Sequence, residues 1–203
     1  MLVLVIVLCY LIGSIPVAWL VARLVTGQDL RGMGSGNVGV MNTALSVTRW
    51  AGALVFLAEA AKGALAVLLA RTLEGSMVSV GLAALAAIVG TRWSVWLRGA
   101  GGRGNTAAMT ALALISWPSL LCLGAVWLLA RLIARSSFIA MRVTLALIPV
   151  VLGLVTRSWP AAIFGAAFSV LFLTTHSTDT DDHLLMKDRW SGLRNFLTMP
   201  RRK

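Results

Sequence analysis

Long apolar stretches, separated by short polar connections, occupy most of the chain. A helix needs roughly 20 consecutive apolar residues to cross a bilayer, and most of these stretches approach that length. The pattern predicts an all-α, polytopic integral membrane protein with about seven transmembrane helices and a polar tail over residues 176–203. The stretches lie at about residues 2–25, 51–70, 77–97, 106–115, 119–134, 137–156 and 159–175.

The fourth stretch, residues 106–115, is too short to cross a bilayer by itself. Trp117-Pro118 separates it from the fifth, because proline lacks a backbone donor and favours a break at the preceding residue. Partial helices occur at membrane depth where they are buried in protein or line a cavity. We therefore predict a short fourth helix within a single membrane domain, residues 1–203. Merging the fourth and fifth stretches into one helix would give six spans. This is the weaker alternative, because it moves the basic tail to the other side of the membrane, away from the other cation-rich connections.

The composition agrees with a membrane protein, since 59% of the residues are hydrophobic and 12% are charged, against about a quarter charged in soluble domains. The formal charge of +11 would suggest nucleic acid binding in a soluble protein. Here the cations gather in alternate connections, and the tail adds six more. That set holds Arg31, Arg49, Arg92, Arg98, Arg103, Arg131, Arg135 and Arg142.

The other connections hold only Arg71 and Arg157. Cytoplasmic connections are rich in Lys and Arg, so we expect the N-terminus outside and the C-terminus in the cytoplasm. This asymmetry accounts for the charge without a nucleic acid partner. Cys9 and Cys122 lie inside apolar stretches with no metal-ligand spacing. The sequence therefore predicts neither a disulfide framework nor a metal or cofactor.

Three polar segments on the predicted cytoplasmic side are candidates for chemistry. The first, here called the serine loop, is residues 34–39, Gly-Ser-Gly-Asn-Val-Gly, followed by Asn42. Glycines allow positive φ and close approach to a ligand, and Ser35 and Asn37 supply neutral hydrogen-bonding groups. This pattern suits an anionic headgroup, and it is equally typical of a turn-rich connection.

The second segment, here called the glycine-rich loop, is residues 98–104 and leads directly into the short fourth helix. Backbone N–H groups exposed by glycine, a helix N-terminus and the two arginines Arg98 and Arg103 together favour a phosphate site. The terminal Lys-[Ser/Thr] of a Walker loop is missing. The competing interpretation is an interfacial loop whose arginines only follow the charge asymmetry.

The third segment is the start of the tail, where histidines and aspartates cluster. Such groups suit general acid–base work or a solvated exit from the membrane. The cluster is His176, Asp179, Asp181, Asp182 and His183. Inside the second stretch, Glu59 and Lys62 stand three residues apart and are close enough to pair. Charges at that depth are expensive, so a structural ion pair and a functional role both remain open.

With these residues in view, the chain resembles the bacterial PlsY family, membrane glycerol-3-phosphate acyltransferases that use acyl phosphate. The resemblance is strongest over residues 10–106, and His176 lies where the third motif of the family is expected. The matching residues are 10–16, 29–31, 34–39, Asn42, Lys62-Gly63, Gly90, Val95, Leu97 and Gly101-Gly102-Arg103-Gly104.

The resemblance implies a seven-helix enzyme of the bacterial inner membrane that moves a fatty acyl group from acyl phosphate to glycerol 3-phosphate. It implies catalytic roles for Ser35, Arg103 and His176, membrane lipids as further partners, and no cofactor. Substrate-binding residues would be Gly34, Gly36, Asn37, Asn42, Arg49, Arg98, Gly101, Gly102 and Gly104.

Three positions depart from the family pattern. Leu45 replaces an arginine, Ala100 replaces a lysine, and Thr91 replaces the histidine of a Gly-His pair. Arg49 and Arg98 are the candidates to restore the lost charge. Two hypotheses stay open: an active acyltransferase, and a divergent homologue that binds a lipid or phosphate ester without acyl transfer. A transporter is the least supported, because the repeated broken-helix pattern is missing.

Overall fold

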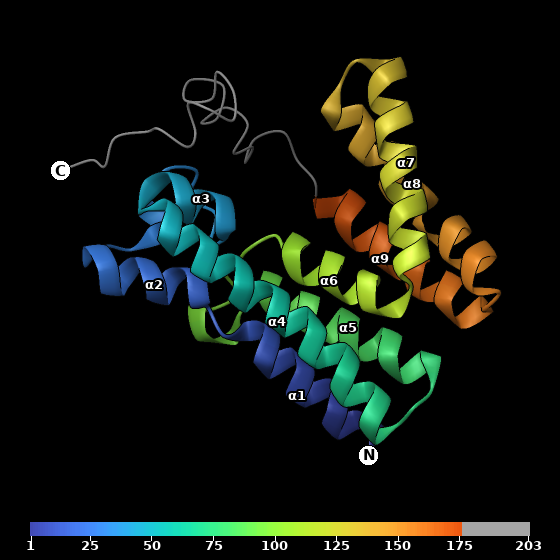
Figure 1. Cartoon of the computed structure of the whole chain (residues 1–203). Coiled ribbons are helices and arrows are strands. Elements are labelled where there is room, and N and C mark those ends of the chain that lie inside the picture. The colour runs from blue at the N-terminus through green and yellow to red at the C-terminus, as the bar shows by residue number, and fades with distance from the viewer. Residues whose placement is uncertain (176–203) are drawn as a thin grey trace.

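The computed structural model describes residues 1–175, and every regular element within them is helical. Figure 1 shows the helices side by side, with the paired helices α7 and α8 projecting at one end. The elements are α1 (Leu2–Ser14), α2 (Val17–Thr26), η1 (Leu30–Gly32), α3 (Val40–Ser46), α4 (Arg49–Leu73), α5 (Met77–Arg92), η2 (Val95–Leu97), α6 (Asn105–Ile115), α7 (Trp117–Ala134), α8 (Ser137–Thr156) and α9 (Trp159–Thr175).

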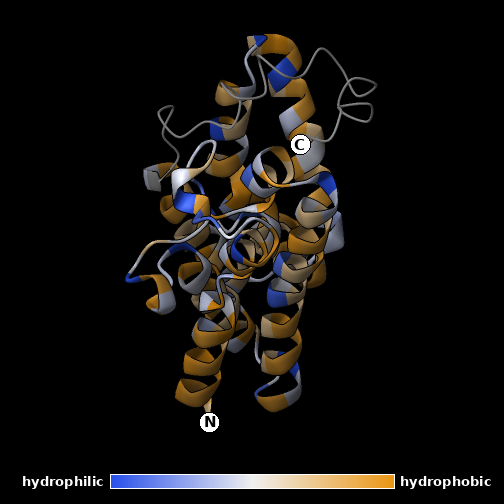
Figure 2. Ribbon diagram, turned by 90° about the vertical axis from the view of Figure 1, so that its left-hand side faces the viewer, coloured by the Kyte–Doolittle hydropathy of each residue, from blue (hydrophilic) through white to orange (hydrophobic). Residues whose placement is uncertain are grey.

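The prediction of an all-helical, multi-pass membrane protein is confirmed. Five segments within residues 1–175 are long and apolar enough to cross a bilayer, and α6 and α9 are shorter apolar helices. Figure 2 shows apolar residues over most of the length of the helices. The short fourth helix and the break before Trp117 lie where the sequence places them. The number of spans, seven, stays a prediction.

The first apolar stretch is not one continuous helix. It divides at Ile15-Pro16, because Pro16 has no backbone donor and Ile15 takes an extended conformation with ψ of 115°. Such a break leaves the last carbonyl groups of α1 without helical partners. Two hydroxyls lie at two of these carbonyl groups. Ser94 donates to the carbonyl oxygen of Ser14 at 2.6 Å, and Thr91 Oγ1 lies 3.2 Å from that of Gly13 and 3.0 Å from that of Ala87.

The third carbonyl, that of Ile15, accepts a hydrogen bond from Lys62 Nζ at 2.6 Å. The same ammonium group donates to Glu59 Oε1 at 2.7 Å, and both side chains are buried. The predicted pair between Glu59 and Lys62 is therefore present. It ties α4 to the break between α1 and α2, next to the polar loops.

Glycines bring the helices of the core unusually close. A Cβ on Gly13 of α1 would lie 2.1 Å from the carbonyl oxygen of Ala87, and one on Gly90 of α5 would lie 2.2 Å from that of Tyr10. Gly63 of α4 has the same relation to Ala107 of α6, at 2.1 Å. Small residues allow such contacts, which replace the hydrophobic driving force that is absent between helices in lipid.

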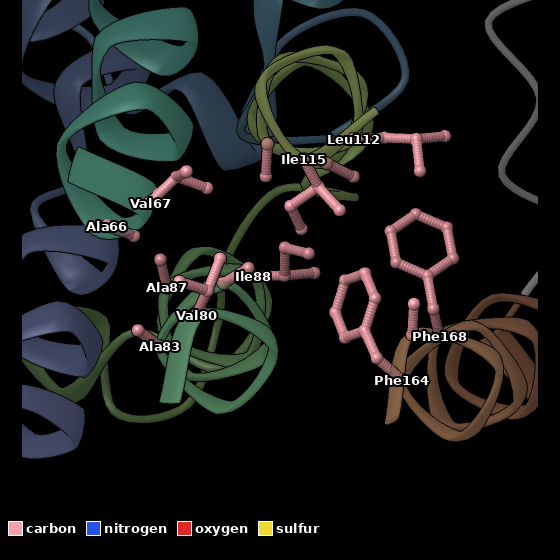
Figure 3. Packing of buried hydrophobic residues seen from close by; sticks show 14 of the residues in the cluster. Ala66, Val67, Val80, Ala83, Ala87, Ile88, Leu112, Ile115, Phe164 and Phe168 are labelled. Atoms are coloured by element: carbon pink, nitrogen blue, oxygen red, sulfur yellow. The ribbon is translucent and has the colours of Figure 1, made fainter. Parts of the chain in front are cut away.

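The main apolar core lies where α4, α5, α6 and α9 converge (Figure 3). Alanines of α4 and α5 fill the narrow contacts, whereas Phe164 and Phe168 of α9 fill the wider space beside Ile88 and Leu112. The two phenylalanine rings meet edge to face, with centroids 6.0 Å apart. This packing holds α6, whose N-terminus follows the glycine-rich loop.

Candidate functional site

The serine loop is organised around the amide of Asn42, which is fully buried on α3. Its Nδ2 donates to the carbonyl oxygens of Asn37 at 2.9 Å and Met33 at 3.0 Å. Its Oδ1 accepts from the backbone N–H of Ser35 at 3.1 Å and from the hydroxyl of Ser46 at 3.0 Å. The geometry makes Asn42 a scaffold beneath the loop. Its predicted contact with substrate stays a prediction.

Two glycines let the chain fold over this amide. Gly34 and Gly36 have φ of +55° and +71°, in the left-handed region that other residues rarely adopt. A Cβ on Gly34 would also collide with Asn42 Oδ1 at 2.2 Å. Between them lies Ser35, half-buried, whose Oγ accepts from the N–H of Asn37 at 3.4 Å. The glycines thus shape the loop rather than touch a ligand through side chains.

An ion pair closes the turn that precedes the serine loop. Asp29 accepts hydrogen bonds from both the side chain and the backbone N–H of Arg31, the closest contact being 2.6 Å to Nη2. Hydrogen bonding to Arg31 holds the pKa of Asp29 well below its usual range. Both side chains are exposed, so the pair organises the local turn and adds little to global stability.

The glycine-rich loop is clamped between α5 and the serine loop. The N–H of Gly102 donates to the carbonyl oxygen of Thr91 at 3.0 Å. A Cβ on Gly101 would lie 2.3 Å from that same oxygen, and a Cβ on Gly102 would lie 2.3 Å from the carbonyl oxygen of Val38. Only glycine fits at these two positions. The loop then ends at Gly104, with φ of +74°, which caps the N-terminus of α6.

These contacts bring the two motifs together around a pocket of about 350 Å³. Ser35 and Asn37 line it from the serine loop, and Arg103 and Gly101 line it from the glycine-rich loop. Arg92, the last residue of α5, also lines it. The sequence pattern indicates for Arg92 only a place among the cations of the predicted cytoplasmic side. Neutral hydrogen-bonding groups and two guanidinium groups in one pocket suit the binding of an anion such as phosphate.

A second pocket of about 290 Å³ adjoins the first, and Asn37 and Arg103 line both. Its other walls include the apolar side chain of Phe56. The first two residues of α6, Asn105 and Thr106, also line it. Glu59 lines it as well, and Glu59 Oε2 is buried without a hydrogen-bond partner among residues 1–175. Arg103 therefore lies between a cationic pocket and a more apolar one.

The remaining predicted site residues lie elsewhere. Arg98, with φ of +56°, lines a separate groove of about 550 Å³ beside Trp19 and Trp96. Arg49 is the exposed first residue of α4. His176 and the rest of the tail cluster lie outside the described residues. Their contacts with substrate, and the restoring roles proposed for Arg49 and Arg98, stay predictions.

The helical fold and the cationic pocket at its polar loops define the class, an integral membrane protein with a candidate site for a phosphate-bearing ligand. The family model for glycerol-3-phosphate acyltransferase matches residues 3–185. The chain belongs to this family. This membership confirms the predicted resemblance, and it favours the acyltransferase hypothesis over the divergent homologue.

Individual relatives agree. Glycerol-3-phosphate acyltransferase 2 of Moorella thermoacetica is 41% identical over 160 residues, which cover 78% of this chain and 81% of the relative. The acyltransferase of Jannaschia sp. is 37% identical over 170 residues, covering 83% and 82%. The crystal structure of PlsY, an integral membrane enzyme in its glycerol 3-phosphate form, matches with a TM-score of 0.78 and 26% identity over 98% of this chain and 99% of that one.

Proposed function

We propose that the protein transfers a fatty acyl group from acyl phosphate to glycerol 3-phosphate, giving lysophosphatidic acid and inorganic phosphate. The pocket shared by Ser35, Asn37 and Arg103 carries the proposal, because it joins two loops far apart in the sequence into one anion site. The apolar side of the adjoining pocket, with Val40, Met41 and Phe56, suits the acyl carbons next to the reacting carbonyl. Family membership supports glycerol 3-phosphate as the acceptor.

Acyl phosphate is an activated mixed anhydride, so the site has mainly to position the reactants, stabilise charge and remove a proton. A hydroxyl oxygen of glycerol 3-phosphate attacks the acyl carbon and forms the ester bond. The bond from that carbon to the phosphate oxygen breaks, and phosphate leaves with the electron pair. The hydroxyl proton passes to a base, for which we propose His176.

Arg103 lies between the two pockets, where the carbon–oxygen bond to phosphate breaks in this proposal. Its guanidinium stabilises the negative charge that grows on the departing phosphate. Ser35 orients the attacking hydroxyl by hydrogen bonding. The neighbouring amides of the glycine-rich loop and the N-terminus of α6 add further positive potential.

Turnover of the purified protein in lipid vesicles tests the proposal. Formation of lysophosphatidic acid is measured from labelled glycerol 3-phosphate, with acyl phosphate or acyl-coenzyme A as the donor. We expect product from acyl phosphate only. Ser35→Ala and Arg103→Gln should each lower kcat/KM by roughly tenfold or more, whereas Arg157→Gln, a matched loss of charge at an exposed turn, should not. Absence of product from any acyl donor would refute the proposal.

We also propose a bacterial inner membrane location with the N-terminus outside and the C-terminus in the cytoplasm. Arg92 and Arg103 lie together at the loops of the site. Arg71 lies at the opposite end of α4, where the N-terminal amine approaches Glu74 at 4.0 Å. Reporters fused to each terminus test this arrangement, and activity of an exported-only reporter at the C-terminus would contradict it.

A further inference from the structure

Arg92 places a second cation beside Arg103 in the anion pocket. It is half-buried at the end of α5 and lines the same pocket of about 350 Å³ as Arg103, Ser35 and Asn37. Because both guanidinium groups line one pocket, their positive charges repel each other. A bound anion offsets this repulsion, because its negative charge interacts favourably with both groups in a partly buried site.

Neighbouring groups hold Arg92 in place. Its guanidinium carbon lies 5.6 Å from the centre of the Trp93 ring, within the range of a cation–π interaction. The carbonyl oxygen of Trp93 accepts a hydrogen bond from Tyr10 Oη at 2.9 Å, which ties this end of α5 to α1. Gly101 packs on the backbone of Arg92, since a Cβ there would lie 2.4 Å from the Arg92 carbonyl oxygen. The loop that carries Arg103 is thereby fixed relative to Arg92.

We propose that Arg92 is a phosphate-binding residue of this site and that, together with Arg103, it holds a terminal phosphate group in its dianionic form. The inference rests on the proposed function for the identity of the substrate. The geometry identifies the chemical group, a phosphate carried by glycerol 3-phosphate and by acyl phosphate alike. Kinetic measurements with each substrate distinguish the two.

A cation at a helix C-terminus also has a purely structural use, because it interacts favourably with the helix dipole. That use predicts that loss of Arg92 lowers the melting temperature and leaves phosphate affinity unchanged. Phosphate binding predicts a loss of affinity that exceeds the change in stability. The structural explanation therefore predicts a change in melting temperature alone, whereas phosphate binding predicts a larger change in phosphate affinity.

The experiment compares Arg92→Gln, Arg92→Lys and the control Arg157→Gln in lipid nanodiscs. Stabilisation by inorganic phosphate and by glycerol 3-phosphate is followed by thermal melting, which needs no turnover. We expect Arg92→Gln to weaken binding roughly 10- to 100-fold. Arg92→Lys should restore part of it, because lysine keeps the charge without the planar fork. Arg157→Gln should match the wild type.

The pH dependence adds a readout that a structural role does not move. A phosphate monoester gains its second negative charge near pH 6. Wild-type affinity should therefore rise between about pH 5.5 and 7.5, and the rise should be smaller in Arg92→Gln. If that variant does not fold, the loss of phosphate affinity in Arg92→Lys at neutral pH carries the test, because lysine keeps the charge but lacks the planar fork.

In steady-state kinetics, a rise in KM for glycerol 3-phosphate alone assigns the bound phosphate to the acceptor, and a rise for acyl phosphate alone assigns it to the donor. Phosphate affinity and both KM values within about twofold of wild type would overturn the inference. If the wild type binds phosphate through Arg92 but shows no turnover, the proposed function fails and the phosphate site stands.

Discussion

Replacement of Lys62 by methionine tests the reasoning about the buried ion pair most directly. The change removes two hydrogen bonds, one to Glu59 Oε1 at 2.7 Å and one to the carbonyl oxygen of Ile15 at 2.6 Å. The paired side chains are only 6% and 8% exposed. Loss of one partner leaves a buried carboxylate without its counter-charge, which costs about 3–5 kcal/mol. At about 2–4 °C per kcal/mol, the melting temperature should fall by roughly 6–20 °C.

The assay is thermal melting in lipid nanodiscs of Lys62→Met, of the double variant Glu59→Gln/Lys62→Met, and of Arg23→Met as control. Arg23 is exposed, and within residues 1–175 its side chain bonds to the carbonyl oxygen of Gly27 at the end of its own helix, so its loss should change stability by about 0.5 kcal/mol at most. The double variant should regain most of the loss, because no carboxylate remains and Ile15 still accepts from the N–H of Val17 at 2.9 Å. A double variant that melts no higher than Lys62→Met would refute this account.

Three further changes test the loops by thermal melting. Gly102→Ala places a methyl group 2.3 Å from the carbonyl oxygen of Val38, so it should lower the free energy of unfolding by about 1–3 kcal/mol and abolish activity. In the control Gly124→Ala the methyl group meets open space, so stability should match the wild type. Asn42→Asp replaces the side-chain donor by an acceptor that faces the carbonyl oxygens of the loop. It should lower the free energy of unfolding by about 1–3 kcal/mol, as much as Asn42→Ala. Wild-type stability of Asn42→Asp would contradict the scaffold role. Asp29→Asn should lower stability slightly at pH 7, because Arg31 lowers the pKa of Asp29. The stabilisation is present above the ordinary Asp value of about 3.9 and is lost only as pH falls through the lower folded-state value, so the difference from wild type should disappear only in strong acid.

The helices follow closely from the apolar pattern, yet Pro16 and Pro149, each far from the ends of its apolar stretch, behave differently. Pro149 lies inside α8, which continues through it, whereas the first stretch breaks at Pro16. Both stretches look alike in composition. The break at Pro16 is stabilised by donors outside α1 and α2, because Ser94 and Lys62 bind the carbonyl oxygens of Ser14 and Ile15. Sequence alone cannot place those donors.

Thr91 shows the same limit for the site. As a departure from the family pattern it suggested a lost function, but its hydroxyl lies 3.2 Å from the carbonyl oxygen of Gly13 and its own carbonyl binds Gly102. Thr91 thus joins α1, α5 and the glycine-rich loop. The family resemblance names Ser35, Asn37 and Arg103, which line one pocket and whose contacts with substrate stay predictions. It offered no way to rank Arg49, Arg92 and Arg98 by their distance from that pocket.

By itself, the sequence determined the membrane-embedded helical class, the short fourth helix and the family, because these depend on local apolar length, on proline and glycine, and on ordered motifs. Tertiary structure alone decided which cation joins Arg103. Arg92 and Arg98 are close in sequence, yet Arg92 lines the anion pocket and Arg98 the groove beside Trp96. The cause is the close packing at Gly90 and Gly101, which sets the end of α5 against the returning loop. Such contacts between distant backbones leave no periodic signal along the chain.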